Sequence, residues 1–127
     1  MTRCIQLTDA VIEILRSAED DRVISVCLHV VNTPHALNDV RRFTSHDRWH
    51  VRMHAASALG RIGNDEDVPV LKKLISDTEW WVRYRAAQAL SKLPGIDKTL
   101  LQQIQNETED RYARDIVEVV IAEMELK

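Results

Sequence analysis

An internal repeat of 31 residues limits the fold of this chain more than any other feature. Residues 45–62 (SHDRWHVRMHAASALGRI) recur as residues 76–93 (SDTEWWVRYRAAQALSKL), so that Arg52 aligns with Arg83. A repeat of roughly 20 to 50 residues is typical of solenoids, in which each unit buries its apolar face against neighbouring units. We therefore expect a stack of similar units.

The apolar residues of the second copy have the spacing of one helical face. They are Val82, Ala86, Ala89, Leu90 and Leu93. Ser76-Asp-Thr-Glu79 has the form of a capping box, which predicts that this helix begins at Ser76 and, in the first copy, at Ser45. Pro94-Gly95 and Gly63 are expected to end the two helices.

Shorter helices are predicted between the long ones. Three of them are expected to begin at Thr33-Pro34, at Asp67-Val-Pro69 and at Asp97. Residues 7–15 are expected to form a fourth short helix. The outer copies of the repeat are degenerate, although Arg114 follows Arg83 by the same 31 residues. The whole chain, residues 1–127, reads as one all-α domain of about eight helices: a lone short one, three long–short pairs and a final long one.

Composition narrows the class of protein. The net charge is −3 and the pI is about 5.9, which argues against a general nucleic-acid binder. Cys4 and Cys27 have no CxxC pairing, so we expect buried free thiols in a reducing compartment and a cytoplasmic location. No apolar run reaches the roughly 20 residues of a membrane span, and Asp9 and Glu13 interrupt the N-terminal apolar stretch, so we expect neither membrane insertion by this segment nor a secretory signal.

The string Val-Arg-x-x-Ala-Ala-x-Ala-Leu occurs twice, at residues 51–59 and 82–90. It resembles the HEAT-repeat family, in particular the short bacterial type first described in phycobilisome lyases. The resemblance implies a right-handed α-solenoid of about four HEAT-like helical hairpins with one curved surface for partners. Family members that are iron-dependent hydroxylases carry His-Glu pairs, and this sequence has no His-Glu dipeptide. A bilin lyase-like accessory protein is not excluded by any simple motif.

The repeated arginines resemble the family's ladder of hydrogen bonds between adjacent repeats. Arg52 and Arg83 each follow acidic residues, and Arg114 takes the next position. On this resemblance we assign Asp47, Arg52, Asp77, Arg83 and Arg114 a structural role in the ladder.

A second group of residues lies off the core stripe at repeat spacing. Aromatic and basic side chains lie in the first turns of the two long helices. Trp, Tyr and Arg are the residue types that most often carry binding energy at interfaces. We predict a partner-binding strip formed by Arg48, Trp49, His50, Trp80, Trp81, Tyr84 and Arg85. The alternative is that these rings pack on neighbouring loops and seal one edge of the stack.

Histidines and arginines concentrate in the first copy. His46, His50 and His54 have a spacing of four residues, and His50 and His54 are weak candidates for a metal site, although no carboxylate joins their stripe. We expect no metal and no cofactor. Between residues 41 and 61 there are five arginines but a single acid, Asp47, which makes an anionic ligand plausible there. The five are Arg41, Arg42, Arg48, Arg52 and Arg61.

The two ends of the chain are rich in apolar residues on more than one helical face. At the C-terminal end these are Ile116, Val117, Val119, Val120, Ile121 and Met124, and at the N-terminal end Ile5, Leu7, Val11, Ile12, Ile14 and Leu15. Because a solenoid needs polar outer faces on its terminal units, we expect either a segment of a longer repeat protein or self-association through the ends.

The sequence therefore predicts a non-catalytic scaffold that binds a protein partner of unknown identity. Two alternatives belong to other classes of function. One is a lyase-like accessory that handles a bilin, and the other is a nucleic-acid or anion-binding module that uses the basic residues 41–61.

Overall fold

The computed structural model describes residues 2–126, and these form eight α-helices and three short 3₁₀ helices. The α-helices are α1 (Thr2–Ser17), α2 (Asp21–Val30), α3 (Leu37–Arg42), α4 (Trp49–Ile62), α5 (Val68–Leu74), α6 (Trp80–Lys92), α7 (Lys98–Glu107) and α8 (Arg111–Glu125). The 3₁₀ helices are Pro34–Ala36, Phe43–Ser45 and Asp65–Asp67.

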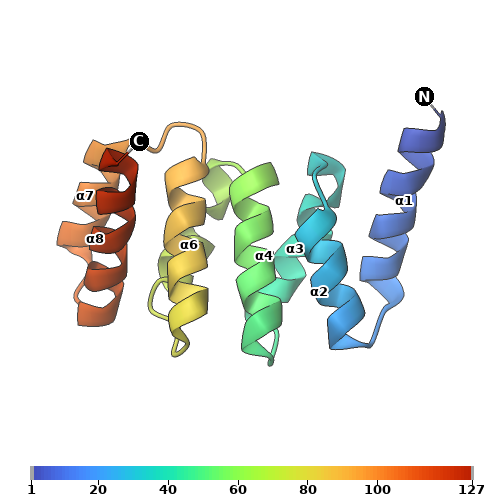
Figure 1. Cartoon of the computed structure of the whole chain (residues 1–127), viewed down its shortest axis with the longest axis horizontal. Coiled ribbons are helices and arrows are strands. Elements are labelled where there is room, and N and C mark those ends of the chain that lie inside the picture. Colours follow the sequence, from blue (N-terminus) through green and yellow to red (C-terminus); the bar gives the residue numbers. More distant parts are fainter. Residues whose placement is uncertain (1, 127) are drawn as a thin grey trace.

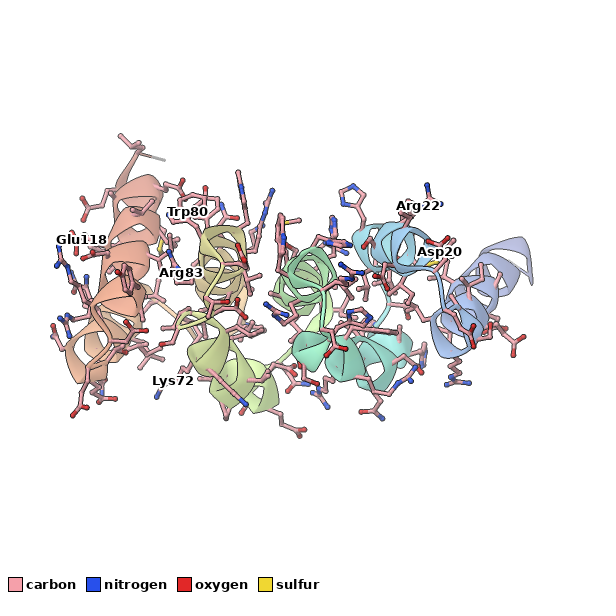
Figure 2. The ribbon with its side chains drawn as sticks, turned by 90° about the horizontal axis from the view of Figure 1, so that it is seen from below. Asp20, Arg22, Lys72, Trp80, Arg83 and Glu118 are labelled. Carbon is pink, nitrogen blue, oxygen red and sulfur yellow. The ribbon has the colours of Figure 1, made fainter. Side chains whose placement is uncertain are left out.

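The helices pair in chain order into four helical hairpins, which stack side by side. In Figure 1, α2, α4, α6 and α8 form one row, and α3 and α7 lie behind it. Helix α4 packs against both α2 and α6, and each of α4, α6 and α8 packs on the helix that precedes it in the chain. Trp80 lies between α6 and α8, whereas Lys72 extends outward from α5 in the other row (Figure 2). The prediction of an all-α solenoid is confirmed.

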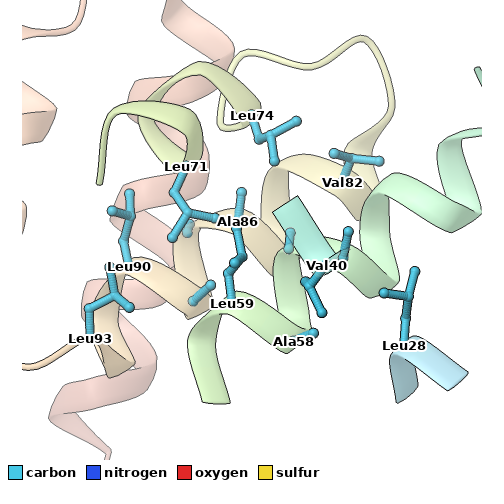
Figure 3. Packing of buried hydrophobic residues seen from close by; sticks show 14 of the residues in the cluster. Leu28, Val40, Ala58, Leu59, Leu71, Leu74, Val82, Ala86, Leu90 and Leu93 are labelled. Atoms are coloured by element: carbon cyan, nitrogen blue, oxygen red, sulfur yellow. The ribbon is translucent and has the colours of Figure 1, made fainter. Parts of the chain in front are cut away.

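Small residues bring α4 and α6 together in the centre of the stack. Ala55, Ala58, Ala86 and Ala89 are buried, and the larger leucines and valines fill the space between the two rows (Figure 3). The approach is closest at Gly60, where an added Cβ would lie 2.8 Å from the Cα of Ala89. The paired alanines therefore set the distance between the two central repeats.

The predicted starts of the two long helices are wrong. Helix α4 begins at Trp49 and α6 at Trp80, four residues after Ser45 and Ser76. In the loop before α6, the Oδ1 of Asp77 accepts a hydrogen bond from the backbone N–H of Glu79 at 3.0 Å. A local turn therefore occupies the residues that the serine capping box would have made helical.

The predicted ends of these helices are confirmed. Gly63 is the C-cap of α4, and α6 ends at Lys92 just before Pro94. Gly95 has a φ of +83°, a left-handed conformation that glycine adopts without steric cost.

The predicted openings of the short helices are largely confirmed. Thr33 caps the turn that leads into α3, and Asp97 caps α7 by accepting from the N–H of Leu100 at 2.8 Å. The turn before α5 begins earlier than expected, since Asn64 forms a capping box with Asp67. The first helix is not short, because α1 spans the 16 residues Thr2–Ser17.

The apolar residues at the C-terminal end are mostly covered. Ile116, Val117, Val120 and Ile121 are buried by the contacts of α8 with α6 and α7, whereas Val119 is exposed. In α1, Ile12 and Leu15 are buried and Ile14 is exposed; the side chains of Ile5 and Leu7 lie outside the described residues. Self-association through the ends stays a prediction.

Candidate functional site

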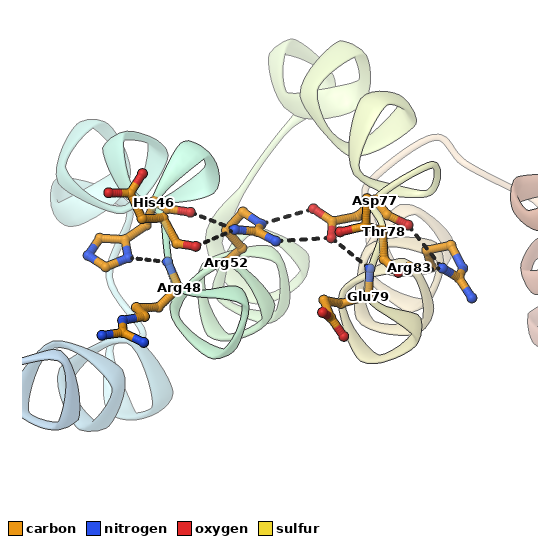
Figure 4. Close-up of polar contacts among 8 residues, drawn as sticks. His46, Arg48, Arg52, Asp77, Thr78, Glu79 and Arg83 are labelled. Carbon is orange, nitrogen blue, oxygen red and sulfur yellow. Dashed lines mark hydrogen bonds and ion pairs between the residues drawn. The ribbon is translucent and has the colours of Figure 1, made fainter.

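Arg52 joins two consecutive repeats through one guanidinium group. Its Nε donates to Asp77 Oδ2 at 2.9 Å and one terminal nitrogen donates to Asp77 Oδ1 at 3.1 Å. The other terminal nitrogen donates to the carbonyl oxygens of His46 and Asp47 at 2.7 and 3.0 Å (Figure 4). The same side chain therefore closes the loop before its own helix and reaches the equivalent loop of the next repeat.

The loop-closing half of this arrangement occurs in α4, α6 and α8. Arg83 and Arg114, like Arg52, each donate to the carbonyl oxygens of the residues five and six positions earlier. The crossing half does not recur, because Thr108 occupies the position that corresponds to Asp77. The guanidinium of Arg83 instead lies 5.3 Å from the centroid of the Tyr112 ring.

One repeat earlier, the ladder positions carry different residue types. Asp21 takes the position of Arg52, and His46 takes the position of Asp77. Their side chains approach to 3.5 Å, and the Arg48 guanidinium also lies 3.5 Å from Asp21. Asp47, which the sequence suggested as a ladder residue, contributes its carbonyl oxygen.

The five arginines of residues 41–61 do not form one free basic surface. Four of them lie within 3.6 Å of a carboxylate oxygen: Arg41 of Asp67, Arg42 of Asp39, Arg48 of Asp21 and Arg52 of Asp77. Arg61 instead donates to the carbonyl oxygens of Leu28 and Val31. Most of the positive charge counted in the sequence is therefore balanced by carboxylates, most of which come from other segments of the chain.

An exposed aromatic cluster occupies the first turns of α6. The ring of Trp80 stacks on Tyr84 with centroids 5.0 Å apart, and Trp81 meets Trp80 edge-on, also at 5.0 Å. The Arg85 guanidinium lies 6.0 Å from the ring centroids of both Trp81 and Tyr84. Trp80 and Trp81 are 45% and 47% exposed, which is high for such large apolar side chains.

Helix α8 holds this cluster in place through Tyr84. The hydroxyl of Tyr84 donates to Glu123 Oε2 at 2.5 Å, and it accepts from Gln88 Nε2 at 2.8 Å. The hydrogen bond to the Glu123 carboxylate, with burial, raises the pKa of Tyr84. The central ring of the cluster is therefore fixed before any partner arrives.

The remaining predicted strip residues lie one repeat earlier and form a separate pair. Trp49 meets the ring of His50 edge-on with centroids 5.8 Å apart, and Trp49 is 38% exposed. Arg48 is the N-cap residue of α4 and faces Asp21 of α2. The structure thus places the seven residues at the starts of α4 and α6, in two groups.

The predicted histidine stripe is wrong at its first member. His46 precedes α4, and its Nδ1 accepts from the N–H of Arg48 at 3.0 Å. The ring of His54 lies against the ring of His29 in α2, with the two centroids 5.8 Å apart. Among the side chains that the structure describes, no three from His, Cys, Asp or Glu are arranged to hold a metal ion.

Sequence reasoning missed a cleft between α2, α4 and α6. It brings His29 and Lys92 beside three residues that the sequence analysis had treated separately, His54, Arg61 and Arg85. The repeat offered a signal for this cleft, because Arg61 and Lys92 are 31 residues apart, as are His54 and Arg85.

Comparison with known proteins identifies the repeat. A family model described as HEAT repeats matches residues 8–91, which include the whole first copy and almost all of the second. No curated protein matches the chain. HEAT repeats generally mediate protein–protein interactions. None of the helices in residues 2–126 is long and apolar enough to cross a membrane.

Proposed function

Because this chain belongs to the HEAT-repeat family, we propose that it is a non-catalytic scaffold that binds a protein partner through the aromatic and basic strip at the starts of α4 and α6. The observation that carries the proposal is the exposed cluster of Trp80, Trp81, Tyr84 and Arg85. The strip includes Arg48, Trp49 and His50 one repeat earlier. A cytoplasmic location is part of the proposal, supported by the buried free thiol of Cys27.

The composition of the cluster matches the residues that dominate protein interfaces. Trp, Tyr and Arg are enriched among residues whose truncation costs the most binding energy. Trp80 and Trp81 are each nearly half exposed, so a partner that covers them would remove a large apolar surface area from water.

The cluster is also ordered in advance. Trp80 stacks on Tyr84, and Tyr84 is held by Glu123 from a neighbouring helix. Side chains that are already fixed lose less conformational entropy on binding than free ones do, and each immobilised flexible side chain would otherwise cost about 0.5–1.5 kcal/mol. The arrangement therefore favours binding over sealing of an edge.

The test is affinity capture with the tagged full chain from an extract of the source organism. The strip variant Trp81→Ala/Arg85→Ala removes one exposed ring and the guanidinium beside it. The control variant Lys72→Ala/Lys73→Ala changes two exposed residues of α5 in the other row. We expect proteins captured by the unchanged chain and by the control to be lost with the strip variant.

The result depends on folded variants, so the helical circular dichroism signal and the thermal midpoint of both are measured first. Retention of the same proteins by a folded strip variant would overturn the proposal. So would capture that the control variant abolishes.

A further inference from the structure

The cleft between α2, α4 and α6 has a volume of about 170 Å³. Its lining comprises His29 from α2 and eight residues of α4 and α6, three of which are permanently cationic. The full set is His29, Met53, His54, Ser57, Arg61, Arg85, Gln88, Ala89 and Lys92. His29, Arg61 and Lys92 are exposed, so a ligand can enter from solvent.

Every charged or titratable side chain that lines the cleft is basic. Three carry a permanent positive charge, two are histidines, and no carboxylate lines the cleft. In the described part of the chain, Arg61, Arg85 and Lys92 form no ion pair with an acid. The arginines of the inter-repeat contacts, such as Arg52 with Asp77, do have such partners.

The repeat makes this concentration of charge unusual. Elsewhere, neighbouring repeats set opposite charges against each other, as Arg52 and Asp77 do. In the cleft, positions that are 31 residues apart both carry basic side chains. Arg61 is equivalent to Lys92, and His54 is equivalent to Arg85. Like charges at short range repel each other, so a bound anion would remove an unfavourable interaction.

The pKa of His54 is shifted by burial and by the basic side chains of the cleft. Burial lowers the pKa of His54, and the positive groups around it lower this pKa further. They are His29 of α2, Arg85 of α6, and His50 and Arg61 of α4 itself.

Two of the three cationic groups, Arg61 and Arg85, are held in place before a ligand binds. Arg61 donates to Leu28 O at 2.6 Å and to Val31 O at 3.1 Å, which fixes its guanidinium near the C-terminal end of α2. Arg85 donates to Gln88 Oε1 at 3.3 Å. Fixed donors bind an anion with less loss of side-chain entropy than flexible ones.

We propose that this cleft is a binding site for a phosphoryl group, held by Arg61, Arg85 and Lys92 together with His29 and His54. A phosphate monoester carries a charge of about −1.5 to −2 at neutral pH and offers three acceptor oxygens, which matches three permanent cations better than a single carboxylate does. The Nε and one terminal nitrogen of Arg61 already donate to the Leu28 and Val31 carbonyl oxygens, so its other terminal nitrogen would donate to the phosphoryl group. Arg85 would add further guanidinium N–H donors, and Lys92 would supply a point charge. The inference goes beyond the proposed function and does not depend on it, because free phosphate is enough to test it.

The test is a titration of the full chain with inorganic phosphate at constant ionic strength, followed by ¹H–¹⁵N NMR. The cleft variant Arg85→Gln/Lys92→Gln is compared with Lys72→Gln/Lys73→Gln, which removes the same charge from α5. We expect saturable shifts around the cleft in the unchanged chain and in the control. In the cleft variant we expect affinity to fall at least about tenfold, the usual effect of losing one charge-assisted hydrogen bond.

Two results would overturn the site. One is a response to phosphate no larger than the response to chloride at the same ionic strength. The other is equal affinity in the cleft variant and the control, which would place any binding elsewhere.

A second titration tests the part given to the histidines. Sulfate does not change its own charge between about pH 8 and about pH 5.5, whereas histidine is the side chain whose ordinary change of charge falls in this range. We expect sulfate to bind more tightly as the pH falls, and His54→Gln to reduce this dependence. An affinity independent of pH would contradict the role of the two histidines.

Discussion

Replacement of Asp77 by alanine tests how the repeats are held together. The Asp77 carboxylate accepts two hydrogen bonds from Arg52, at 2.9 and 3.1 Å, and one from the N–H of Glu79 at 3.0 Å. The side chains of Arg52 and Asp77 are only 16% and 10% exposed. In Asp77→Ala the guanidinium stays largely covered, keeps the His46 and Asp47 carbonyls and loses its counter-ion.

The expected loss follows from this geometry. Removing one partner of a buried ion pair costs about 3–5 kcal/mol, because the other charge stays buried without compensation. The two carbonyl bonds that Arg52 keeps place the cost at the lower end, so Asp77→Ala should lower the free energy of unfolding by about 3 kcal/mol. For a chain of this size that corresponds to a fall in Tm of about 10 °C.

The assay is urea unfolding followed by circular dichroism and tryptophan fluorescence. Asp77→Asn keeps an acceptor for Arg52 and should cost less, about 1.5 kcal/mol. Asp47→Ala is the matched control, because Asp47 contributes its carbonyl to Arg52; the change should stay within about 0.5 kcal/mol. Equal losses for Asp47→Ala and Asp77→Ala would refute the reasoning, as would a loss below about 1 kcal/mol for Asp77→Ala.

Three further predictions concern α4 and α6. Gly60→Ala should destabilise the chain by about 1–2 kcal/mol in urea unfolding, since its Cβ would lie 2.8 Å from Ala89 Cα; a gain, the usual effect in a helix, would contradict this. Because the pKa of His54 is lowered, the unfolded state binds more protons below about pH 6.5, so stability should fall there; His54→Gln should flatten this fall, and an unchanged slope would refute the cause. Tyr84→Phe should lose about 1 kcal/mol with the hydrogen bond to Glu123, and no loss would show that bond to be unimportant.

The architecture was predictable because the repeat is a local, periodic signal. The buried alanines and the valine and leucine positions recur at one spacing, and the structure packs them between adjacent hairpins. The starts of the long helices were not predictable from local pattern alone. Ser76 and Glu79 match a capping box, yet the loop between them is held by the distant contact of Arg52 with Asp77.

The part that Asp47 takes in the ladder could not be predicted from its position close to Arg52 in the sequence. Asp47 precedes Arg52 as an acid near the same loop, but His46, not Asp47, aligns with Asp77. Asp47 does take part in the ladder, but through its carbonyl oxygen, and the offset of 31 makes His46 the residue equivalent to Asp77.

The basic residues 41–61 show the limit of counting charges along the chain. Asp67 and Asp77 come from later segments and pair with Arg41 and Arg52. Conversely, the residues that line the cationic cleft come from α2, α4 and α6. Only the packing of these three helices shows which of their faces lie side by side. The sequence placed the aromatic side chains outside the core stripe, where the structure leaves Trp49, Trp80 and Trp81 exposed. The division of these side chains into two groups required the positions of the rings.

Photo-crosslinking tests the proposed binding surface most directly. A p-benzoylphenylalanine replaces Trp81, which is 47% exposed beside Trp80, and in a second protein it replaces Lys72 on α5. The account predicts that the probe at position 81 crosslinks the captured partner and that the probe at position 72 does not. Crosslinking from position 72 alone, or equally from both positions, would contradict binding through the strip.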